Sequence, residues 1–187
     1  MGITHLTDRT TIEAFLRRNP ELHIYSLGDL DDFFWPYTTW YGWEEDAQLR
    51  DIALVYKGQP SATVVGISAR PATMRKLLRA ITPLLPQRFY AHLSPGMERV
   101  FEGTHQLDSH GPHHKMALHD RSCVLGTDCS QAVRLTHRDL DDLLRLYDES
   151  YPANWFDPRR LGFEIVAPYG EFAIERREQT VSYHPER

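Results

Sequence analysis

Five histidines lie within fifteen residues near the middle of the chain, and imidazole groups can bind a metal ion or transfer protons. They are His105, His110, His113, His114 and His119. A zinc site needs three or four ligands that converge at about 2 Å, and Cys123 is a further candidate ligand. On an extended strand, however, His113 and His119 point to one side and His114 points to the other. We therefore interpret the segment as the polar face of an exposed hairpin and expect no metal.

A second concentration of chemistry-bearing side chains is the segment FFWPYTTWYGW, residues 33–43, with seven aromatic residues in eleven positions. Aromatic rings can form the wall of a ligand pocket, and Asp29, Asp31 and Asp32 can accept hydrogen bonds from a cationic amine. The alternative is a packed core beside an acidic face in solvent. Trp155 and Phe156 form a similar aromatic pair later in the chain. The predicted substrate-binding residues are Asp29, Trp35, Tyr37, Trp40, Trp155 and Phe156.

The sequence lacks the motifs that define common catalytic and phosphate-binding sites. The two glycines nearest to one another, Gly96 and Gly103, are seven residues apart, so neither GxGxxG nor GxxxxGK occurs. There is also no GxSxG, HExxH or CxxC motif. Ser94 and Ser150 have no nucleophile motif around them, and we interpret His92 as an ordinary half-buried strand residue. The sequence alone therefore assigns no catalytic, cofactor-binding or metal-binding residue.

The elements that must position these side chains follow from hydrophobic periodicity and from turn residues. Strands are expected at 2–6, 52–56, 61–67, 88–93 and 172–175, where β-branched or aromatic residues are frequent. Residues 105–110 and 113–119 are expected to form a hairpin around Gly111-Pro112. Helices are expected after Asp8, within 21–34, from Pro71, within 95–101, after Thr136 and from Pro158. The pattern is that of an α/β protein of the α+β type.

A short repeat suggests that the chain contains two related parts. Residues 3–9, ITHLTDR, resemble residues 132–138, AVRLTHR, and each copy runs from an extended segment into an amphipathic helix. In the second copy, Thr136 and Asp139 form a near relative of the capping box. Residues 121–131 are small and polar, as in a linker. We predict a domain at 1–120, a linker at 121–131 and the start of a second, similar domain at 132–187.

Charge and composition exclude several classes of protein. The 187 residues include 21 Lys and Arg against 26 Asp and Glu, so the chain lacks the basic surplus of a nucleic-acid binder. It has no run of 18 apolar residues and no secretory signal pattern, so we expect a cytoplasmic protein without a membrane span. Two cysteines, Cys123 and Cys129, are too few for a disulfide scaffold.

Four segments resemble bacterial proteins of the GNAT N-acetyltransferase superfamily. They are LGDLDDFFWPYTTWY at 27–41, HLSPGMERVF at 92–101, HHKMAL at 113–118 and VRLTHRDLDDLLRLYDESYPANWFDPRRL at 133–161. The expected order of strands and helices is similar as well. The resemblance implies a GNAT-like mixed sheet flanked by helices, followed by an incomplete second GNAT-like βααβ unit. It also implies transfer of an acetyl group from acetyl-coenzyme A to a small-molecule or peptide amine.

The sequence departs from this superfamily at the coenzyme loop. There, the pyrophosphate of acetyl-coenzyme A binds backbone amides of a [QR]-x-x-G-x-[GA] loop between the fourth strand and the next helix. The corresponding residues, 68–73, contain no glycine, and the second copy would place its loop beyond residue 187. We therefore expect an acetyltransferase-like chain that is inactive or truncated in its second half. One alternative is a non-catalytic substrate-recognition or regulatory module that has lost its coenzyme site. Another is a fragment that forms a homodimer through an open strand edge after Tyr183.

Overall fold

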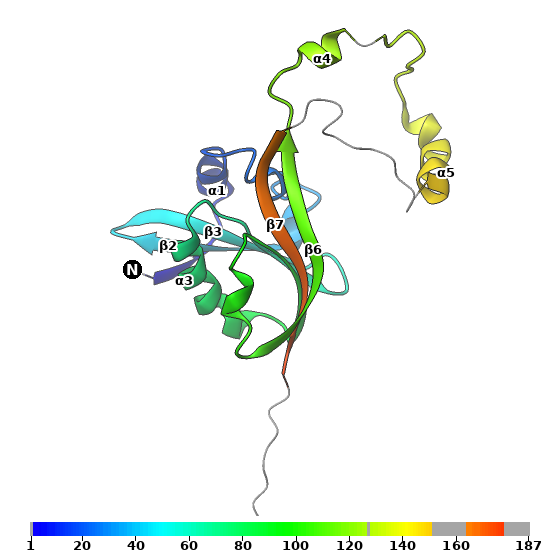
Figure 1. Ribbon diagram of the computed structural model, residues 1–187. Helices are drawn as coiled ribbons and strands as arrows, with labels where there is room; N and C mark the ends of the chain where they lie inside the picture. The colour runs from blue at the N-terminus through cyan, green and yellow to red at the C-terminus, as the bar shows by residue number, and fades with distance from the viewer. Residues whose placement is uncertain (1, 127, 151–163, 178–187) are drawn as a thin grey trace, which may run out of the picture. The chain divides into compact units, whose positions relative to one another are not determined.

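The computed structural model describes residues 2–126, 128–150 and 164–177, and its main feature is a seven-stranded mixed sheet (Figure 1). The strand order is β1-β2-β3-β4-β5-β7-β6. The strands are β1 (Gly2–Leu6), β2 (Thr38–Glu45), β3 (Gln48–Tyr56), β4 (Ala62–Gly66), β5 (Arg88–Leu93), β6 (His105–Ala117) and β7 (Glu164–Arg176). β4 and β5 run parallel, whereas β1–β2, β2–β3, β3–β4 and β5–β7 pair in antiparallel fashion. The expected mixed sheet with helices is confirmed.

Helices and short 3-10 turns connect the strands. The α-helices are α1 (Arg9–Leu16), α2 (Ile24–Gly28), α3 (Pro71–Ile81), α4 (Ser122–Leu125) and α5 (Leu140–Ser150). The 3-10 turns are η1 (Trp35–Tyr37), η2 (Thr82–Leu84), η3 (Glu98–Val100) and η4 (His137–Asp139). Asp8 caps α1, as expected, by accepting hydrogen bonds from the backbone N–H groups of Thr10 and Thr11. Within the described residues, no helix is long and apolar enough to cross a membrane.

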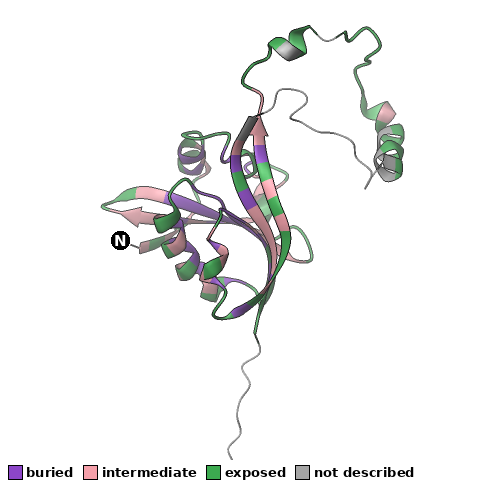
Figure 2. Ribbon diagram, in the orientation of Figure 1, coloured by how far each residue is buried: buried purple, intermediate pink, exposed green. Residues whose placement is uncertain are grey.

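Two hydrophobic clusters pack on the two faces of the sheet, because alternate strand residues point to opposite faces. Val64 belongs to the cluster that contains the apolar face of α3, and its neighbour Val65 belongs to the cluster that contains α1. On α3 the buried residues are Met74, Leu77, Leu78 and Ile81, which recur at helical spacing. Figure 2 shows buried residues concentrated along the central strands.

Three local expectations are wrong. Residues 105–117 form the single strand β6 instead of a hairpin, since Gly111-Pro112 lies inside the strand. The helix expected within 21–34 is only the five-residue α2, because the chain around Gly28 and the aspartates that follow it turns repeatedly. β2 was not expected at all, although aromatic and threonine residues favour a strand.

The C-terminal described strand joins the main sheet. β7 lies between β5 and β6, and its residues 170–175 pair with 88–93 of β5. The described residues divide into two compact units, one drawn from 1–115 and 166–187 and the other from 116–165. The strand expected at 172–175 is therefore part of the sheet that β1 begins, while the origin of 132–187 as a second GNAT-like copy stays a prediction. A helix was expected from Pro158 to Val166. Its residues up to 163 lie outside the described residues, and residues 164–166 belong to the strand β7 instead.

The unit drawn from 116–165 contains the predicted capping box. The backbone N–H of Thr136 donates to Asp139 Oδ2 at 2.7 Å, and the backbone N–H of Arg138 donates to Thr136 Oγ1 at 3.3 Å. These bonds fix the start of η4, which α5 continues. The expected helix start after Thr136 is confirmed.

Candidate functional site

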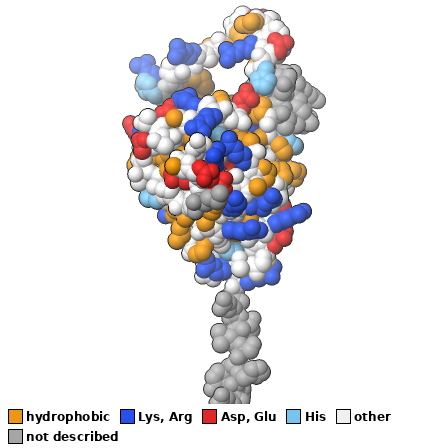
Figure 3. All heavy atoms as spheres, turned by 90° about the vertical axis from the view of Figure 1, so that its left-hand side faces the viewer, with side chains coloured by type: hydrophobic (Ala, Val, Ile, Leu, Met, Phe, Trp, Pro, Cys, Tyr) orange, Lys and Arg blue, Asp and Glu red, His pale blue; other side chains and the backbone are white. Residues whose placement is uncertain are grey.

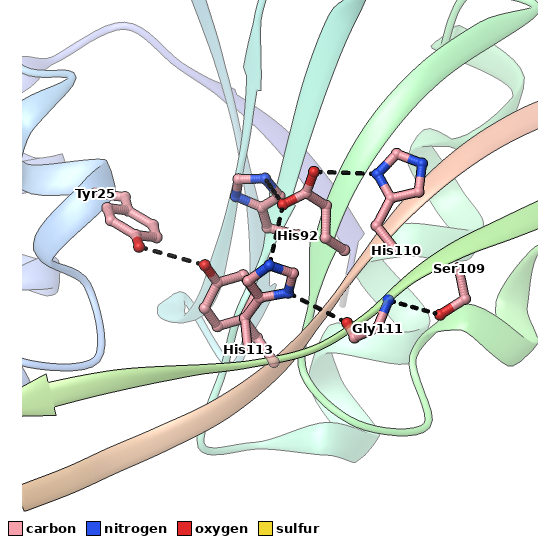
Figure 4. Close-up of polar contacts among 8 residues, drawn as sticks. Tyr25, His92, Ser109, His110, Gly111 and His113 are labelled. Atoms are coloured by element: carbon pink, nitrogen blue, oxygen red, sulfur yellow. Dashed lines mark hydrogen bonds and ion pairs between the residues drawn. The ribbon is translucent and has the colours of Figure 1, made fainter. Parts of the chain in front are cut away.

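Three imidazoles from two strands surround the carboxylate of Glu171 on β7. We call His92, His110, His113 and Glu171 the His–Glu cluster, and Figure 4 labels its three histidines. His110 Nδ1 lies 3.3 Å from Glu171 Oε1, and the Nε2 atoms of His92 and His113 lie 3.6 and 3.8 Å from Oε2. The four side chains are between 25% and 39% exposed, so a ligand can reach them.

Strand register brings the cluster together. His92 and Glu171 are direct cross-strand partners in the β5–β7 pair, and such partners project from the same face. On a regular strand, residues three apart point to opposite faces, yet His110 and His113 of β6 both face Glu171. Gly111, with φ of +94°, lies between them and interrupts the regular alternation. Its carbonyl also accepts a hydrogen bond from His113 Nδ1 at 3.2 Å, which orients that ring (Figure 4).

Two tyrosines border the cluster. The ring of Tyr169 stacks on His113 with 5.3 Å between centroids, and its centroid lies 5.5 Å from that of His92. Its hydroxyl lies 3.3 Å from the hydroxyl of Tyr25 on α2. Burial, with help from the hydrogen bond to Tyr25, raises the pKa of Tyr169. The Tyr169 hydroxyl therefore remains protonated at neutral pH and can donate a hydrogen bond.

A buried lysine lies beside these tyrosines. Lys115, on β6, is 5% exposed, and its Nζ donates to the carbonyl of Leu22. Nζ lies 4.4 Å from the ring centroid of Tyr25, a cation–π contact. Among the described residues no carboxylate pairs with it. Burial lowers its pKa to about 8, because the charged form has lost water without gaining an anionic partner.

The balance of burial and charge makes His92 the best proton acceptor of the cluster. Burial lowers the pKa of His92, and the positive charges of His113 and Lys115 lower it further, while Glu171 opposes them. A neutral imidazole next to a carboxylate can take a proton from a substrate, and the carboxylate then stabilises the imidazolium. In the part of the chain that the structure describes, no group of three or more His, Cys, Asp or Glu side chains is arranged to hold a metal ion.

A second polar network lies where β4 ends, and we call it the Asp51 network. Asp51 is 2% exposed and accepts a hydrogen bond of 2.6 Å from Ser68 Oγ. The backbone N–H of Ser68 donates to Ser94 Oγ at 2.9 Å, and that of Arg70 donates to Ser68 Oγ at 2.8 Å. Burial raises the pKa of Asp51 to about 6, with the Ser68 hydrogen bond acting against it.

The Asp51 network borders a cavity of about 200 Å³ that includes Arg18, Arg50 and Arg70 in its lining. These guanidinium groups form no ion pair with a carboxylate of the described residues, so they can bind phosphate oxygens. The loop backbone does not fit a phosphate cradle, because Thr73 and Met74 donate their N–H groups to the Arg70 carbonyl and Pro71 has none. Any coenzyme phosphate at this place would therefore bind through arginine side chains.

The residues predicted to bind substrate are not members of the His–Glu cluster, although the backbone N–H of Asp29 donates to the carbonyl of Tyr25 at 3.0 Å. Trp40 is 1% exposed in the α1-side core, stacked on the half-buried Trp35 with 6.2 Å between centroids. Tyr37 is 49% exposed at the end of η1. Asp29 caps the C-terminus of α2, and burial raises its pKa. Trp155 and Phe156 lie outside the described residues, and the substrate-binding role of the whole set stays a prediction.

Sequence reasoning missed Tyr25, Tyr169 and Glu171 and interpreted His92 as an ordinary residue. Half-burial of His92 was expected correctly, but its partner lies on a strand far away in the sequence. His110 and His113 were considered as possible metal ligands within a hairpin, where they would lie on different strands, and no shared carboxylate partner was predicted for them. A glycine followed by proline inside a polar strand was the available signal that the alternation breaks there.

Comparisons with known proteins leave the family open. No protein-family model matches the chain, and no curated protein matches it in sequence. Among solved structures, the aminoglycoside 6'-N-acetyltransferase from Enterococcus faecium is similar over 100% of both chains, with a TM-score of 0.42 and 13% identity.

Proposed function

We propose that the His–Glu cluster is the acid–base centre of a GNAT-like acyltransferase that acts on an amine. The proposal rests on one observation, a half-buried imidazole of lowered pKa, His92, held 3.6 Å from the carboxylate of Glu171. An amine in water is mostly protonated and must lose a proton to attack a thioester. A neutral base at the attack site meets this need.

Each residue at the proposed acid–base centre has a separate role. His92 takes the proton from the amine, and Glu171 stabilises the imidazolium that results. His110 and His113 hold the carboxylate from its other sides, so that it does not rotate away from His92. The protonated hydroxyl of Tyr169, linked to Tyr25, supplies a hydrogen-bond donor for developing negative charge.

Acetyl-coenzyme A, which the resemblance implies as co-substrate, would supply the acyl group. Its phosphates would meet the guanidinium groups of Arg18, Arg50 and Arg70 at the cavity beside the Asp51 network. The acceptor would be a small-molecule or peptide amine, and an aminoglycoside is the acceptor that the name of the similar structure suggests.

The test is amine-dependent release of the coenzyme thiol from acetyl-coenzyme A, measured over a panel of amines that includes an aminoglycoside. We expect His92→Asn and Glu171→Gln to reduce kcat by about 100-fold or more. His114→Asn is the matched control, since His114 is exposed on the same strand and takes no part in the cluster. For the unaltered chain, kcat/KM should rise with pH through an apparent pKa below the ordinary histidine value of 6.5. Unchanged kcat in both cluster variants would contradict the assignment.

A second candidate, a recognition module without coenzyme, is favoured by the backbone amides of residues 68–74 that are already hydrogen-bonded within the chain. The predicted amine site of Asp29, Trp35 and Tyr37 belongs to this candidate. Its aromatic face already binds one organic cation, because the Arg9 guanidinium carbon lies 4.8 Å from the Trp35 ring centroid. Calorimetry separates the two functions. Absence of acetyl-coenzyme A binding at millimolar concentration, together with amine binding that Trp35→Ala weakens, supports the module and removes the enzyme.

A further inference from the structure

A cavity of about 700 Å³ lies at the opposite end of β5 from the His–Glu cluster. His92 is near the C-terminal end of β5, whereas the cavity is lined by Gln87, directly before the strand. The lining also includes Thr104 and His105 at the start of β6 and Arg176 and Arg177 at the end of β7. We call it the Arg176–Arg177 cavity.

Main-chain hydrogen bonds hold the walls of this cavity in place. The backbone N–H of Arg176 donates to the Gln87 carbonyl at 2.8 Å, and that of Arg177 donates to the Thr104 carbonyl at 3.0 Å. The segments before β5, before β6 and after β7 are thereby tied to one another. A ligand would meet a site that needs little rearrangement, which reduces the entropic cost of binding.

The lining carries positive charge without a compensating carboxylate. Neither Asp nor Glu is among the described lining residues, and no described carboxylate forms an ion pair with Arg176 or Arg177. The guanidinium groups of these two consecutive residues offer fork-shaped sets of N–H donors that match the oxygens of a phosphate group. The amide of Gln87 adds a neutral donor at the same wall.

One buried lining residue has an unused polar atom. His105 is fully buried, and its Nδ1 lies 2.8 Å from Thr104 Oγ1, while its Nε2 has no partner among the described residues. Buried polar atoms without a partner are rare in native proteins and call for a specific explanation. Burial and the nearby Arg176 lower the pKa of His105, so the ring is neutral and one nitrogen carries a hydrogen. Nε2 is itself buried, so His105 lies beneath the cavity surface and can report on ligand binding without contacting the ligand.

The surface near α3 is also basic, although the chain as a whole has a net charge of −5. Arg75 and Arg79 lie on α3 beside Lys76, whose charge is paired with Glu45 at 2.9 Å, and Figure 3 shows Lys and Arg side chains gathered over the lower half of the face that carries this helix. A local positive field raises the rate at which anions arrive.

We propose that the Arg176–Arg177 cavity is a binding site for the phosphate group of a small ligand. Arg176 and Arg177 bind the phosphate oxygens, and Gln87 supplies a further donor. The site does not depend on acyl transfer, since it shares no residue with the His–Glu cluster.

The test is a calorimetric titration of the full chain with inorganic phosphate and, separately, with AMP, at constant ionic strength set with sodium chloride. We expect saturable binding, and a loss of affinity of at least tenfold in the Arg176→Gln/Arg177→Gln double variant. Both side chains are exposed, so the variant should fold, and Arg121→Gln/Arg134→Gln is the matched control with two exposed arginines of the other unit. Tighter binding of AMP than of phosphate identifies a phosphate monoester as the ligand class, and equal binding identifies free phosphate.

A second measurement follows the His105 ring by NMR and does not depend on the arginine variants. The NMR signals of the His105 ring should shift on addition of phosphate and should stay in place when chloride replaces phosphate. Equal effects of chloride and phosphate, or unchanged phosphate affinity in the double variant, would overturn the proposal.

Discussion

Replacing Lys115 by methionine should stabilise the folded chain at neutral pH. This gain over the unaltered protein should decrease at high pH. Lys115 is buried, without an anionic partner among the described residues, and folding lowers its pKa from 10.5 to about 8. Each pKa unit corresponds to about 1.4 kcal/mol, so the protonated lysine costs the folded state about 3 kcal/mol. Methionine has a similar length and no charge, and it therefore removes this cost.

The sign of the pH dependence follows from where each state holds the proton. Below pH 8 both the folded and the unfolded chain carry it, and the whole cost is present. Between about pH 8 and 10.5 the folded chain has lost the proton while the unfolded chain keeps it, so the cost declines. Above pH 10.5 neither state is charged. The free energy of unfolding of Lys115→Met minus that of the unaltered chain should thus fall by about 3 kcal/mol between pH 7 and pH 10.5.

Urea unfolding at half-unit steps of pH measures this difference. The substitution also removes the hydrogen bond to Leu22 and the contact with Tyr25. Their loss shifts the difference in free energy of unfolding by a constant amount and leaves its pH dependence unchanged. Lys57→Met, at an exposed position in the turn between β3 and β4, is the control and should give a difference that does not vary with pH. A Lys115→Met curve parallel to that of the unaltered chain would refute the assignment of an unpaired buried charge.

Three further predictions concern stability. Asp51 has a folded pKa raised from 3.8 to about 6, so its stabilisation of the folded state is present below pH 3.8 and is lost as pH rises through 6. Relative to Asp51→Asn, the free energy of unfolding of the unaltered chain should fall by about 2 kcal/mol between pH 4 and pH 7 in urea unfolding, and the same pH dependence in both chains would count against this. Trp40→Ala should cost about 3–5 kcal/mol by calorimetric unfolding, and the partly exposed Trp35 should cost clearly less. Gly111→Ala should cost about 1–2 kcal/mol and should weaken the amine-dependent activity, because φ of +94° is strained for alanine. Gly103→Ala, without a positive φ and with open space at its Cβ, should be neutral, and an equal loss there would remove the conformational argument.

The sequence predicted best those elements whose pattern is local. The strand at 88–93 and the helix from Pro71 occur where expected, because apolar residues recur there at intervals of two and of three to four. β2 escaped notice because its turn to β3 uses Asp46 and Ala47, both with positive φ, and alanine gives no turn signal of the kind that glycine gives. The aromatic side chains of that segment left a pocket wall and a packed core as alternatives. Trp40 packs in the core, and the substrate-binding role of the set stays a prediction.

The candidate site was hard to predict because its parts come from distant places in the chain. His92 and Glu171 face one another only through the β5–β7 register, and no spacing rule in one sequence links them. His110 and His113 share a carboxylate only because Gly111 interrupts the strand. Burial, which lowers the pKa of both His92 and Lys115, is likewise a property of the assembled sheet.

The insertion of β7 between β5 and β6 has a consequence for the order of folding events. Within the described sheet β6 is an edge strand whose neighbour is β7, so it cannot take its place in the sheet until residues 164–176 have been synthesised. A contact of such high sequence separation forms slowly, since a long loop must close first. During synthesis on the ribosome, β5 would present an unpaired edge until the residues of β7 have been added, which is a hazard for association with other chains. Because the same late strand carries Glu171, the sheet and the proposed acid–base centre would be completed in one step. A chain that had not yet reached that step would expose an unpaired strand edge and would lack proton-transfer activity.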